Sequence, residues 1–404
     1  MRDFLPAEKA QRERVLAVIR GNYRAHGFDE IETPVMEDSA RLHAGLGGDN
    51  EKLAFAVMKR ALSADDLTAA AASANPLELA DLGLRFDLTV PLARFYATHR
   101  AALPAVFRAI QIAPVWRAER PQKGRYRQFV QCDIDIIGEP GALAEVELIT
   151  ATADTLTKLG LTGWSVRIND RRILTTMLSH WGVPADQHDR ALITIDKLDK
   201  IGADGVAAEL SESGITADGL ADTLTTTGWN LLEGDAPAWL NADAYRDLLA
   251  LRDAVPHVDL AFDPTLVRGM GYYTGTIFEV AHPASSSSLG GGGRYDGMIG
   301  RFLGTDVPAC GFSLGFERLV DLVDLTETQS TDAVALVYDT AVPASRLVEL
   351  KQHLVAAGSR VRLEQRTKNT KTLLERLALD GFTHFAFVDA TSTPESLELR
   401  PLDT

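Results

Sequence analysis

The stretch RAERPQKGRYRQF, residues Arg117 to Phe129, is the most unusual part of this 404-residue chain. Five cationic side chains lie within eleven residues of it, together with a single acid, Glu119. The whole chain is acidic, with a formal net charge of −15, so this positive charge is local. Extended runs at residues 107–119 and 127–138 flank the stretch and predict a hairpin with a basic loop. Such a loop suits a polyanion, because arginine forks match phosphate oxygens. The alternative is a solvated hairpin tip.

The returning strand of the hairpin supports the ligand interpretation. Side chains alternate between the two faces of a strand, so Phe129, Gln131, Asp133 and Asp135 share one face. The opposite face is apolar and consists of Val130, Cys132, Ile134 and Ile136. Three polar positions that face one way beside a basic loop favour a binding site over a solvated tip.

Composition limits the class of protein. The length predicts two or three domains, and 46% apolar with 24% charged residues is typical of a soluble globular protein. No apolar run approaches the roughly eighteen residues of a membrane span, and the N-terminus has no signal-peptide core. Two cysteines, Cys132 and Cys310, cannot form a disulfide framework and lack metal-ligand spacing. We therefore expect a cytoplasmic protein that has neither membrane nor DNA as a partner, although local basic patches permit RNA binding.

The pattern of segments predicts three parts. Residues 1–180 and 256–325 mix strands and helices in one core, and residues 181–255 are helical and acidic, as in an insertion. Residues 332–404 alternate β-α-β-α-β, which predicts a small α/β domain with parallel strands. The segment SSSSLGGGG, residues 285–293, is of low complexity and predicts a turn or flexible loop.

Within the core, local patterns predict individual elements. Helices are expected at about residues 6–26 and 142–159, where apolar residues follow a helical period. A strand is expected around Leu84–Leu88, followed by a helix that starts near Pro91. The Ala- and Ser-rich segment Ala64 to Pro76 predicts a surface excursion.

Two short patterns carry no assignment. GFSLG, residues 311–315, fits the G-x-S-x-G pattern of a hydrolase nucleophile elbow, but this pattern occurs by chance and the FERL that follows gives the turn another role. The glycines of GGGGRYDG fit no P-loop, and the nine histidines include no H-E-x-x-H, so neither a P-loop site nor a zinc enzyme is predicted.

Several long motifs resemble one family. RAERPQKGRYRQF is similar to motif 2 of class II aminoacyl-tRNA synthetases, in the form found in histidyl-tRNA synthetases. GFDEIETPVMED (27–38) resembles motif 1, the dimer-forming strand and its proline, and GFSLGFERL (311–319) resembles motif 3. LVRGMGYYTGTIFE (266–279) and GGGRYDGMI (291–299) resemble the two histidine-specific segments. The motifs follow the family's order, so the resemblance covers nearly the whole chain.

The resemblance implies an α+β fold: an antiparallel-sheet class II catalytic core with a helical insertion, plus a small C-terminal α/β domain similar to the family's anticodon-binding domain. It implies a homodimer formed through the motif 1 region. The implied activity is histidine–tRNA ligation, in which ATP activates L-histidine as histidyl-adenylate and tRNA(His) accepts it at the 3′ end. Mg²⁺ would accompany ATP, without a dedicated all-protein metal site.

By resemblance, the basic loop and motif 3 bind ATP. Arg117 would contact the α-phosphate and take part in catalysis, with Glu119 near the adenine amino group. Arg125 would contact the triphosphate, Phe129 would stack on adenine, and Arg318 would pair with the γ-phosphate. The alternative for Arg318 is a helix-surface arginine paired to the neighbouring glutamate.

Other matched positions imply a histidine pocket. Asp87 and Thr89 would bind the α-amino group, and Asp135 with Tyr273 would bond the imidazole nitrogens. The implied histidine-binding set is Asp87, Thr89, Gln131, Asp135, Tyr272 and Tyr273. The alternatives are a turn or cap carboxylate for Asp87 and a solvent-facing strand residue for Asp135.

Arg268 is the implied electrostatic catalyst, because two anions must meet when a carboxylate attacks a phosphorus atom. The chain departs from the family's RGLDYY form at Gly271, which removes a carboxylate from beside the two tyrosines. This departure concerns the detail of the pocket and also leans toward a non-catalytic relative.

Basic residues in two places, together with one glutamine, are expected to contact tRNA. They are Arg120, Gln122 and Lys123 in the loop, and Arg360, Arg362, Arg366, Lys368 and Lys371 in the C-terminal domain. A solvated helix and strand edge is the alternative for the second group.

Two rival functions remain open. Synthetase-like paralogues bind histidine and regulate the phosphoribosyltransferase that opens histidine synthesis, but they typically lack the C-terminal domain and parts of the ATP or tRNA motifs. This chain keeps Arg117, Glu119, Arg268 and Arg318, which favours the enzyme. An RNA-binding module without catalysis would leave the histidine pocket unexplained.

Overall fold

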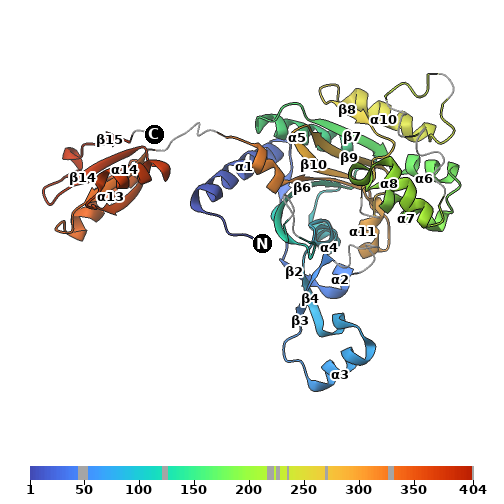
Figure 1. The fold of residues 1–404 in the computed structure, drawn as a ribbon, viewed down its shortest axis with the longest axis horizontal. Helices are drawn as coiled ribbons and strands as arrows, with labels where there is room; N and C mark the ends of the chain where they lie inside the picture. Colours follow the sequence, from blue (N-terminus) through green and yellow to red (C-terminus); the bar gives the residue numbers. More distant parts are fainter. Residues whose placement is uncertain are drawn as a thin grey trace. The chain divides into compact units, whose positions relative to one another are not determined.

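The computed structural model describes residues 1–43, 53–120, 126–215, 223, 228–233, 236–268, 272–325 and 332–402. The chain divides into two compact units, Met1–Phe4 with Ala10–Asp324 and Leu5–Lys9 with Leu325–Thr404 (Figure 1). The boundary near residue 325 separates the C-terminal segment, whereas residues 181–255 group with the rest of the first unit. The three-part division expected from the sequence stays a prediction. Among the described helices, none is both long enough and apolar enough to cross a lipid bilayer.

An eight-stranded sheet forms the centre of the first unit. Its strands, in spatial order, are β1 (Asp29–Glu30), β5 (Phe107–Trp116), β6 (Gln128–Ile137), β11 (Ala309–Gly315), β10 (Ser285–Arg294), β9 (Thr276–His282), β7 (Ser165–Asp170) and β8 (Leu260–Phe262). The pairings are antiparallel except at the two edges, where β1 pairs with β5 and β8 pairs with β7 in parallel. The antiparallel-sheet core expected from the sequence is confirmed.

The basic hairpin has the predicted form. β5 and β6 pair antiparallel from Phe107 opposite Ile137 to Trp116 opposite Gln128. Beyond the ladder, the Arg117 amide donates to the Arg127 carbonyl at 2.9 Å. The register fixes which face of β6 each side chain occupies, because a slip by one residue would reverse all of them.

The first unit also contains helices. They are α1 (Pro6–Ala25), α2 (Ser39–His43), α3 (Ala64–Ser73), α4 (Thr89–His99), α5 (Leu143–Lys158), α6 (Arg171–His180), α7 (His188–Ile195), α8 (Leu198–Glu212), α10 (Ala242–Ala254), α11 (Asp296–Leu303) and α12 (Phe316–Leu322), with short 3-10 turns at Pro76–Leu79, Arg100–Ala102 and Ala185–Gln187. α5 packs on β6 and β11, whereas α4 packs against α11. The α4–α11 core contains Phe86, Leu92, Phe107, Tyr272 and Tyr295, so two predicted pocket segments meet in one apolar cluster.

The expected turn or flexible loop at SSSSLGGGG is wrong, because these residues form β10 in the middle of the sheet. The glycines are needed for close packing. A Cβ atom at Gly292 would lie 1.9 Å from the Gly311 carbonyl oxygen, and one at Gly290 would lie 2.6 Å from the Ser313 carbonyl oxygen. The run of glycines is therefore explained by the close approach of the neighbouring backbone, and it does not indicate a flexible loop.

The strand expected around Leu84–Leu88 needs correction, whereas the expected surface excursion is confirmed and contains a helix. The strand lies earlier than expected: β4 spans Ala80–Leu84 and ends at the residue where the expected strand began. The helix α4 begins at Thr89, with Pro91 in its first turn, as expected. The surface excursion Ala64–Pro76 contains the helix α3, which Ser63 caps by accepting from the Asp66 amide at 3.1 Å. Alanine favours a helix once such a cap is present.

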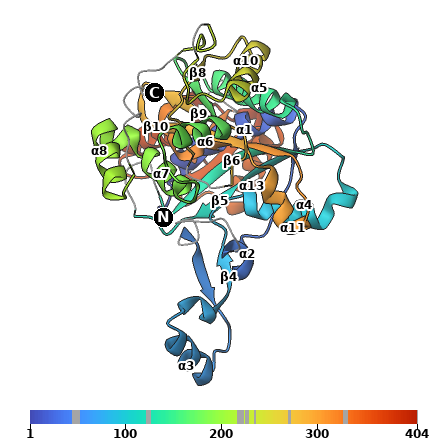
Figure 2. The same ribbon diagram turned by 90° about the vertical axis from the view of Figure 1, so that its right-hand side faces the viewer.

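A small three-stranded sheet carries α3 away from the rest of this unit (Figures 1 and 2). It consists of β2 (Met36–Asp38), β4 and β3 (Phe55–Met58), in the spatial order β2-β4-β3. This places the motif 1 segment between the large sheet, which β1 joins, and the projecting arm.

The C-terminal unit has the predicted parallel α/β arrangement. Its elements are β12 (Ala333–Tyr338), α13 (Ala344–Ala356), β13 (Arg360–Gln365), α14 (Thr370–Leu379), β14 (His384–Val388), a 3-10 turn at Pro394–Ser396 and β15 (Arg400–Pro401). β12 pairs in parallel with both β13 and β14, and β15 adds an antiparallel edge. Apolar clusters on both sides of β12 give this unit its own core.

Candidate active site

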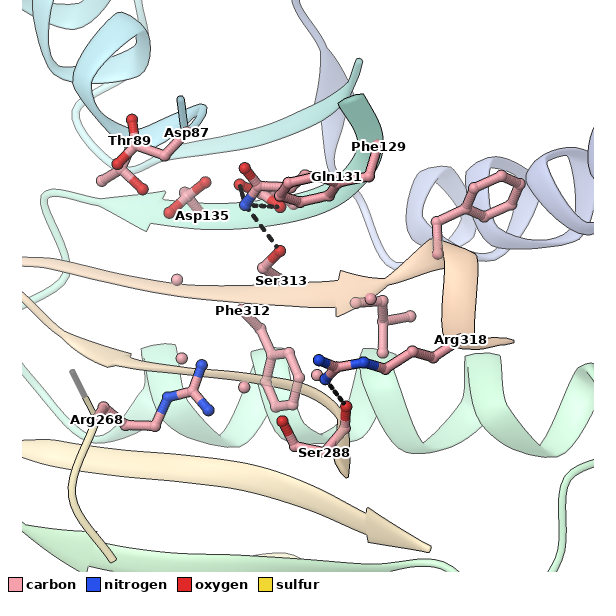
Figure 3. A pocket seen from close by; sticks show the side chains of 18 of the residues that line it. Asp87, Thr89, Phe129, Gln131, Asp135, Arg268, Ser288, Phe312, Ser313 and Arg318 are labelled. Carbon is pink, nitrogen blue, oxygen red and sulfur yellow. Dashed lines mark hydrogen bonds between the residues drawn. The ribbon is translucent and has the colours of Figure 1, made fainter. Parts of the chain in front are cut away.

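A deep cavity lies on the large sheet where β6, β11 and β10 run side by side, and it encloses about 1200 Å³ including its open mouth. The acidic side chains of Asp87 and Asp135 lie at one end together with the Thr89 hydroxyl, whereas Phe129 and Arg318 lie toward the other end (Figure 3). A concave site lined by apolar walls and a few converging polar groups is typical of small-molecule binding.

Asp87 stands at the acidic end, just before α4. It is 2% exposed, and its Oδ1 accepts the Val90 amide at 3.3 Å. The cap expected as the alternative is therefore real, but it uses one oxygen only. Within the described part of the chain, Oδ2 is buried without a hydrogen-bond partner. Burial raises the pKa of Asp87 to about 6, partly offset by the Val90 amide and by Arg117. A buried acceptor without a partner suits a cationic ligand.

Asp135 lies deeper, at the same end. It is 4% exposed, so the solvent-facing alternative is wrong. The Tyr295 hydroxyl donates to its Oδ1 at 2.6 Å. Burial raises the pKa of Asp135 to about 7 against the effect of this hydrogen bond. A carboxyl group that titrates near neutrality can accept from, or donate to, an imidazole nitrogen.

Gln131 and Asp133 line the cavity between the acidic end and the end that holds Phe129 and Arg318. The Gln131 amide nitrogen donates to the Ser313 hydroxyl at 3.2 Å and lies 3.4 Å from an Asp133 oxygen. Burial, together with the nearby Asp135 charge, raises the pKa of Asp133 well above its usual range. Ser313 sits within β11, opposite Asp133 and Gly291, so GFSLG is a strand segment and forms no nucleophile elbow.

Arg117 and Phe129 form the wall nearest the basic loop. The Arg117 Nε donates to the Phe86 carbonyl at 2.9 Å, and its guanidinium carbon lies 5.1 Å from the centroid of the Phe129 ring. Glu119 lines the same wall. A flat aromatic ring beside a fixed cation can hold a base and a phosphate together.

Arg318 reaches the cavity from the start of α12. Its Nη1 donates to the Ser288 carbonyl (Figure 3). The neighbouring Glu317 carboxylate accepts a fork of two bonds from Arg12, at 2.6 and 2.7 Å. The cavity placement supports the ligand-facing interpretation of Arg318 over a surface arginine.

Arg268 lies against the glycine strand. Its Nη1 donates to Glu279 Oε2 at 2.6 Å, and a Cβ atom at Gly291 would lie 2.8 Å from its guanidinium carbon. A Cβ atom at Gly311 would likewise lie 2.0 Å from Asp135 Oδ1. The glycines of β10 and β11 therefore create the space in which the two opposite charges face the cavity.

Most of the predicted ATP and histidine residues thus share one cavity. Those lining it are Asp87, Thr89, Arg117, Glu119, Phe129, Gln131, Asp135, Arg268, Tyr272, Tyr273 and Arg318. Arg125, Gln122, Lys123 and Gly271 lie outside the described residues. Arg120 is described and exposed.

The C-terminal basic residues lie on β13, on α14 and on the segment that connects them, residues 366–369. Arg360 and Arg362 stack over Phe382 at 4.5 and 4.4 Å. Arg362 also pairs with Asp380 at 2.8 Å, and Arg366 lies 3.6 Å from Asp339. Lys368 is exposed, and Lys371 lies 3.9 Å from Glu375. Acids therefore offset part of this basic face.

Several cavity residues were not assigned from the sequence. They are Tyr126, Asp133, Ser288, Tyr295, Ser313 and Glu317. Asp133 could have been found, because strand alternation already placed it beside Gln131 and Asp135. The others act through partners that are distant in sequence, such as the Tyr295–Asp135 pair, and no local pattern marks them.

Comparisons with known proteins identify sequence relatives of the chain. Residues 1–319 match the family described as histidyl-tRNA synthetase. The chain is 62% identical to the protein named histidine–tRNA ligase of Leifsonia xyli subsp. xyli (strain CTCB07), over 100% of this chain and 97% of the relative. It is 42% identical to the probable histidine–tRNA ligase of Tropheryma whipplei (strain Twist), over 100% of this chain and 98% of the relative.

Solved structures share the fold. A histidyl-tRNA synthetase from Nostoc sp. PCC 7120 superposes with a TM-score of 0.74 at 24% identity, covering 96% of this chain and 90% of that chain. A protein from Bacillus halodurans C described as an ATP phosphoribosyltransferase regulatory subunit/histidyl-tRNA synthetase gives 0.76 at 20% identity, covering 97% of both chains. By its sequence relatives and its matched motifs, the chain belongs to the histidyl-tRNA synthetase family.

Proposed function

We propose that this chain is a histidine–tRNA ligase, which activates L-histidine with ATP and transfers the histidyl group to tRNA(His). The observation that carries the proposal is the single cavity that has buried carboxylates at one end and arginines beside an aromatic ring at the other. The first end suits an ammonium and an imidazole, and the second suits a nucleoside triphosphate.

Two steps make up the reaction. An oxygen of the histidine carboxylate bonds to the α-phosphorus of ATP while the bond to the bridging oxygen breaks and pyrophosphate leaves. A ribose hydroxyl at the 3′ end of tRNA then attacks the carbonyl carbon of the adenylate, and AMP leaves. No side chain has to act as a nucleophile, so positioning and fixed charge do the catalysis. We assign charge stabilisation to Arg117 and Arg268, and the γ-phosphate contact to Arg318.

Histidine selection is assigned to the acidic end. Asp87 and Thr89 would hold the α-ammonium, and Asp135 with Tyr273 would bond the two imidazole nitrogens. Asp135 already holds the Tyr295 hydroxyl, so its orientation is fixed before the ligand arrives. An analogue without both ring nitrogens would leave these buried groups without partners, which discriminates strongly.

Mg²⁺, a homodimer and a cytoplasmic setting complete the proposal. Mg²⁺ would add positive charge to the triphosphate, through phosphate oxygens. The dimer would form through residues 27–38, where Val35 and Met36 are 40% and 47% exposed. The cytoplasmic setting is supported by Cys132 and Cys310, which are buried thiols.

Histidine-dependent exchange of pyrophosphate into ATP tests the enzyme. The purified protein is expected to catalyse this exchange with Mg²⁺ and without tRNA, because the cavity holds both ends of the first reaction. The measurement is labelled pyrophosphate entering ATP, with histidine omitted as the control. Absence of exchange above background, in protein that binds histidine, would instead support the regulatory relative.

The C-terminal unit is proposed to bind tRNA. Deleting residues 326–404 should lower tRNA charging far more than adenylate formation, because its basic residues are remote in sequence from the ATP motifs. A finer test replaces Arg366, Lys368 and Lys371 by alanine. The control variant replaces Arg346 and Lys351, on α13 of the same unit, by alanine.

The triple variant is expected to weaken tRNA binding and reduce its salt dependence, by about one unit of slope for each phosphate group that the variant no longer binds. Adenylate formation should not change. An equal loss of exchange and charging, in protein that keeps its thermal transition, would contradict an RNA-binding role for this unit.

A further inference from the structure

Arg2 lies against the nucleotide end of the cavity, although the N-terminal segment belongs to none of its motifs. The Arg2 guanidinium carbon lies 4.5 Å from the centroid of the Tyr126 ring. Its Nη2 also donates to Glu317 Oε2 at 3.3 Å. Tyr126 and Glu317 both line the cavity. Arg2 therefore contacts both Tyr126, just after the basic loop, and Glu317, in the first turn of α12.

A stack of rings and guanidinium groups anchors this segment to α1. Phe4 contacts two cations, with the Arg2 and Arg12 guanidinium carbons at 4.7 and 4.0 Å from its ring centroid. Arg12 also lies 4.6 Å from the Phe316 centroid. Alternating cations and aromatic rings give Arg2 a preferred place, because each ring face attracts the charge beside it.

Glu317 joins this stack to the cavity wall. It is 6% exposed, and Arg12 compensates its charge through a two-pronged bond. Its Oε1 also accepts the Val130 amide at 3.2 Å. Val130 lies between Phe129 and Gln131, and Glu317 directly precedes Arg318. The side chains proposed to touch the adenine and the γ-phosphate thus share one buried carboxylate as a support.

We propose that Met1–Phe4 is a positioning element of the nucleotide site, which acts through Tyr126 and Glu317. Arg2 holds the Tyr126 ring at the end of the basic loop, and the segment keeps the Arg12–Glu317 pair covered. That the nucleotide is ATP rests on the proposed function. The positioning itself rests on the contacts above.

The test centres on Arg2, because its replacement should leave the fold intact. Its side chain is 35% exposed, whereas removal of Arg12 would take the two-pronged partner from the buried Glu317 carboxylate. The variants are Arg2→Ala, Tyr126→Leu and both together. Arg24→Ala is the matched control, since this arginine pairs with Glu30 at 2.8 Å on the surface of α1.

Two readouts separate the inference from the proposed function. Calorimetric titration gives the dissociation constant for ATP, and pyrophosphate exchange gives separate KM values for ATP and histidine. Arg2→Ala is expected to weaken ATP binding about threefold to tenfold, as removal of a partly exposed cation–π pair should. The KM for histidine should not change, and the double variant should be little worse than Tyr126→Leu alone.

The outcomes are decisive either way. Unchanged ATP binding in Arg2→Ala, an equal rise in both KM values, or fully additive effects of the two substitutions would overturn the positioning role. If the wild-type protein shows no exchange, the proposed function fails, and the calorimetric comparison still decides the inference. An effect of Arg24→Ala as large as that of Arg2→Ala would also overturn it, because the effect would then be general to α1.

Discussion

Arg268→Ala is expected to lower the rate of histidyl-adenylate formation about a hundredfold to a thousandfold, or roughly 3–4 kcal/mol of transition-state stabilisation. In the structure its guanidinium faces the cavity and is held by Glu279 at 2.6 Å. A cation fixed in advance contributes most where negative charge develops, at the non-bridging oxygens during attack. Single-turnover adenylation measures the rate, and separate titrations give the dissociation constants for histidine and ATP.

Binding of the two substrates should change much less than the rate. Arg268→Lys should recover little, because an ammonium group cannot reproduce the planar fork that Glu279 and the phosphate would share. Arg171→Ala provides a control, since this arginine pairs with Asp189 at 3.0 Å at the start of α6. An intact single-turnover rate with weaker histidine binding would make Arg268 a pocket residue instead of the catalyst.

Local periodicity explains what the sequence could predict. The alternation along β6 placed Phe129, Gln131 and Asp135 on one face, and the structure confirms that all three line the cavity. The same two-residue period included Asp133, whose place in the cavity needed no further information. The parallel C-terminal unit was predictable for a similar reason, because a repeated strand–helix alternation allows few topologies.

Contacts between distant segments explain what the sequence could not predict. The Tyr295 bond to Asp135 joins residues 160 positions apart, and the Arg12 bond to Glu317 spans 305 positions. Nothing local distinguishes such residues from ordinary core or surface positions. The glycines of β10 led to the wrong prediction of a loop for a related reason. The β11 backbone that lies against them is brought there only when the sheet forms.

Asp87→Asn is expected to weaken histidine binding on the order of thirtyfold to a thousandfold, or about 2–4 kcal/mol. Asparagine keeps the shape and the oxygen that caps α4 through the Val90 amide. It removes the counter-charge for the α-ammonium in a buried site, where water cannot replace it. The loss should appear in the dissociation constant more than in the adenylation rate, because the ammonium is bound in ground and transition states alike.

The pH dependence of this loss tests whether the charge of Asp87 is responsible. Burial raises the pKa of Asp87 to about 6, so the carboxylate is ionised above that pH and takes up a proton below it. The ratio of the dissociation constants of Asp87→Asn and wild type should therefore be largest near pH 7.5 and fall toward one as the pH drops below about 6. Titration of the ligand's own imidazole affects both proteins equally and cancels in the ratio.

Asp133→Asn is the matched control in the same cavity. Burial and the neighbouring Asp135 raise the pKa of Asp133 well above its usual range, which favours the neutral acid. Asp133 accepts from the Gln131 amide and is not assigned to the α-ammonium, so Asp133→Asn should change histidine affinity less than Asp87→Asn. Calorimetric titration of both variants from pH 5 to 7.5 makes the comparison. A ratio for Asp87→Asn that stays flat across this range would show that shape or hydrogen bonding, not the ionised carboxylate, makes Asp87 important for binding.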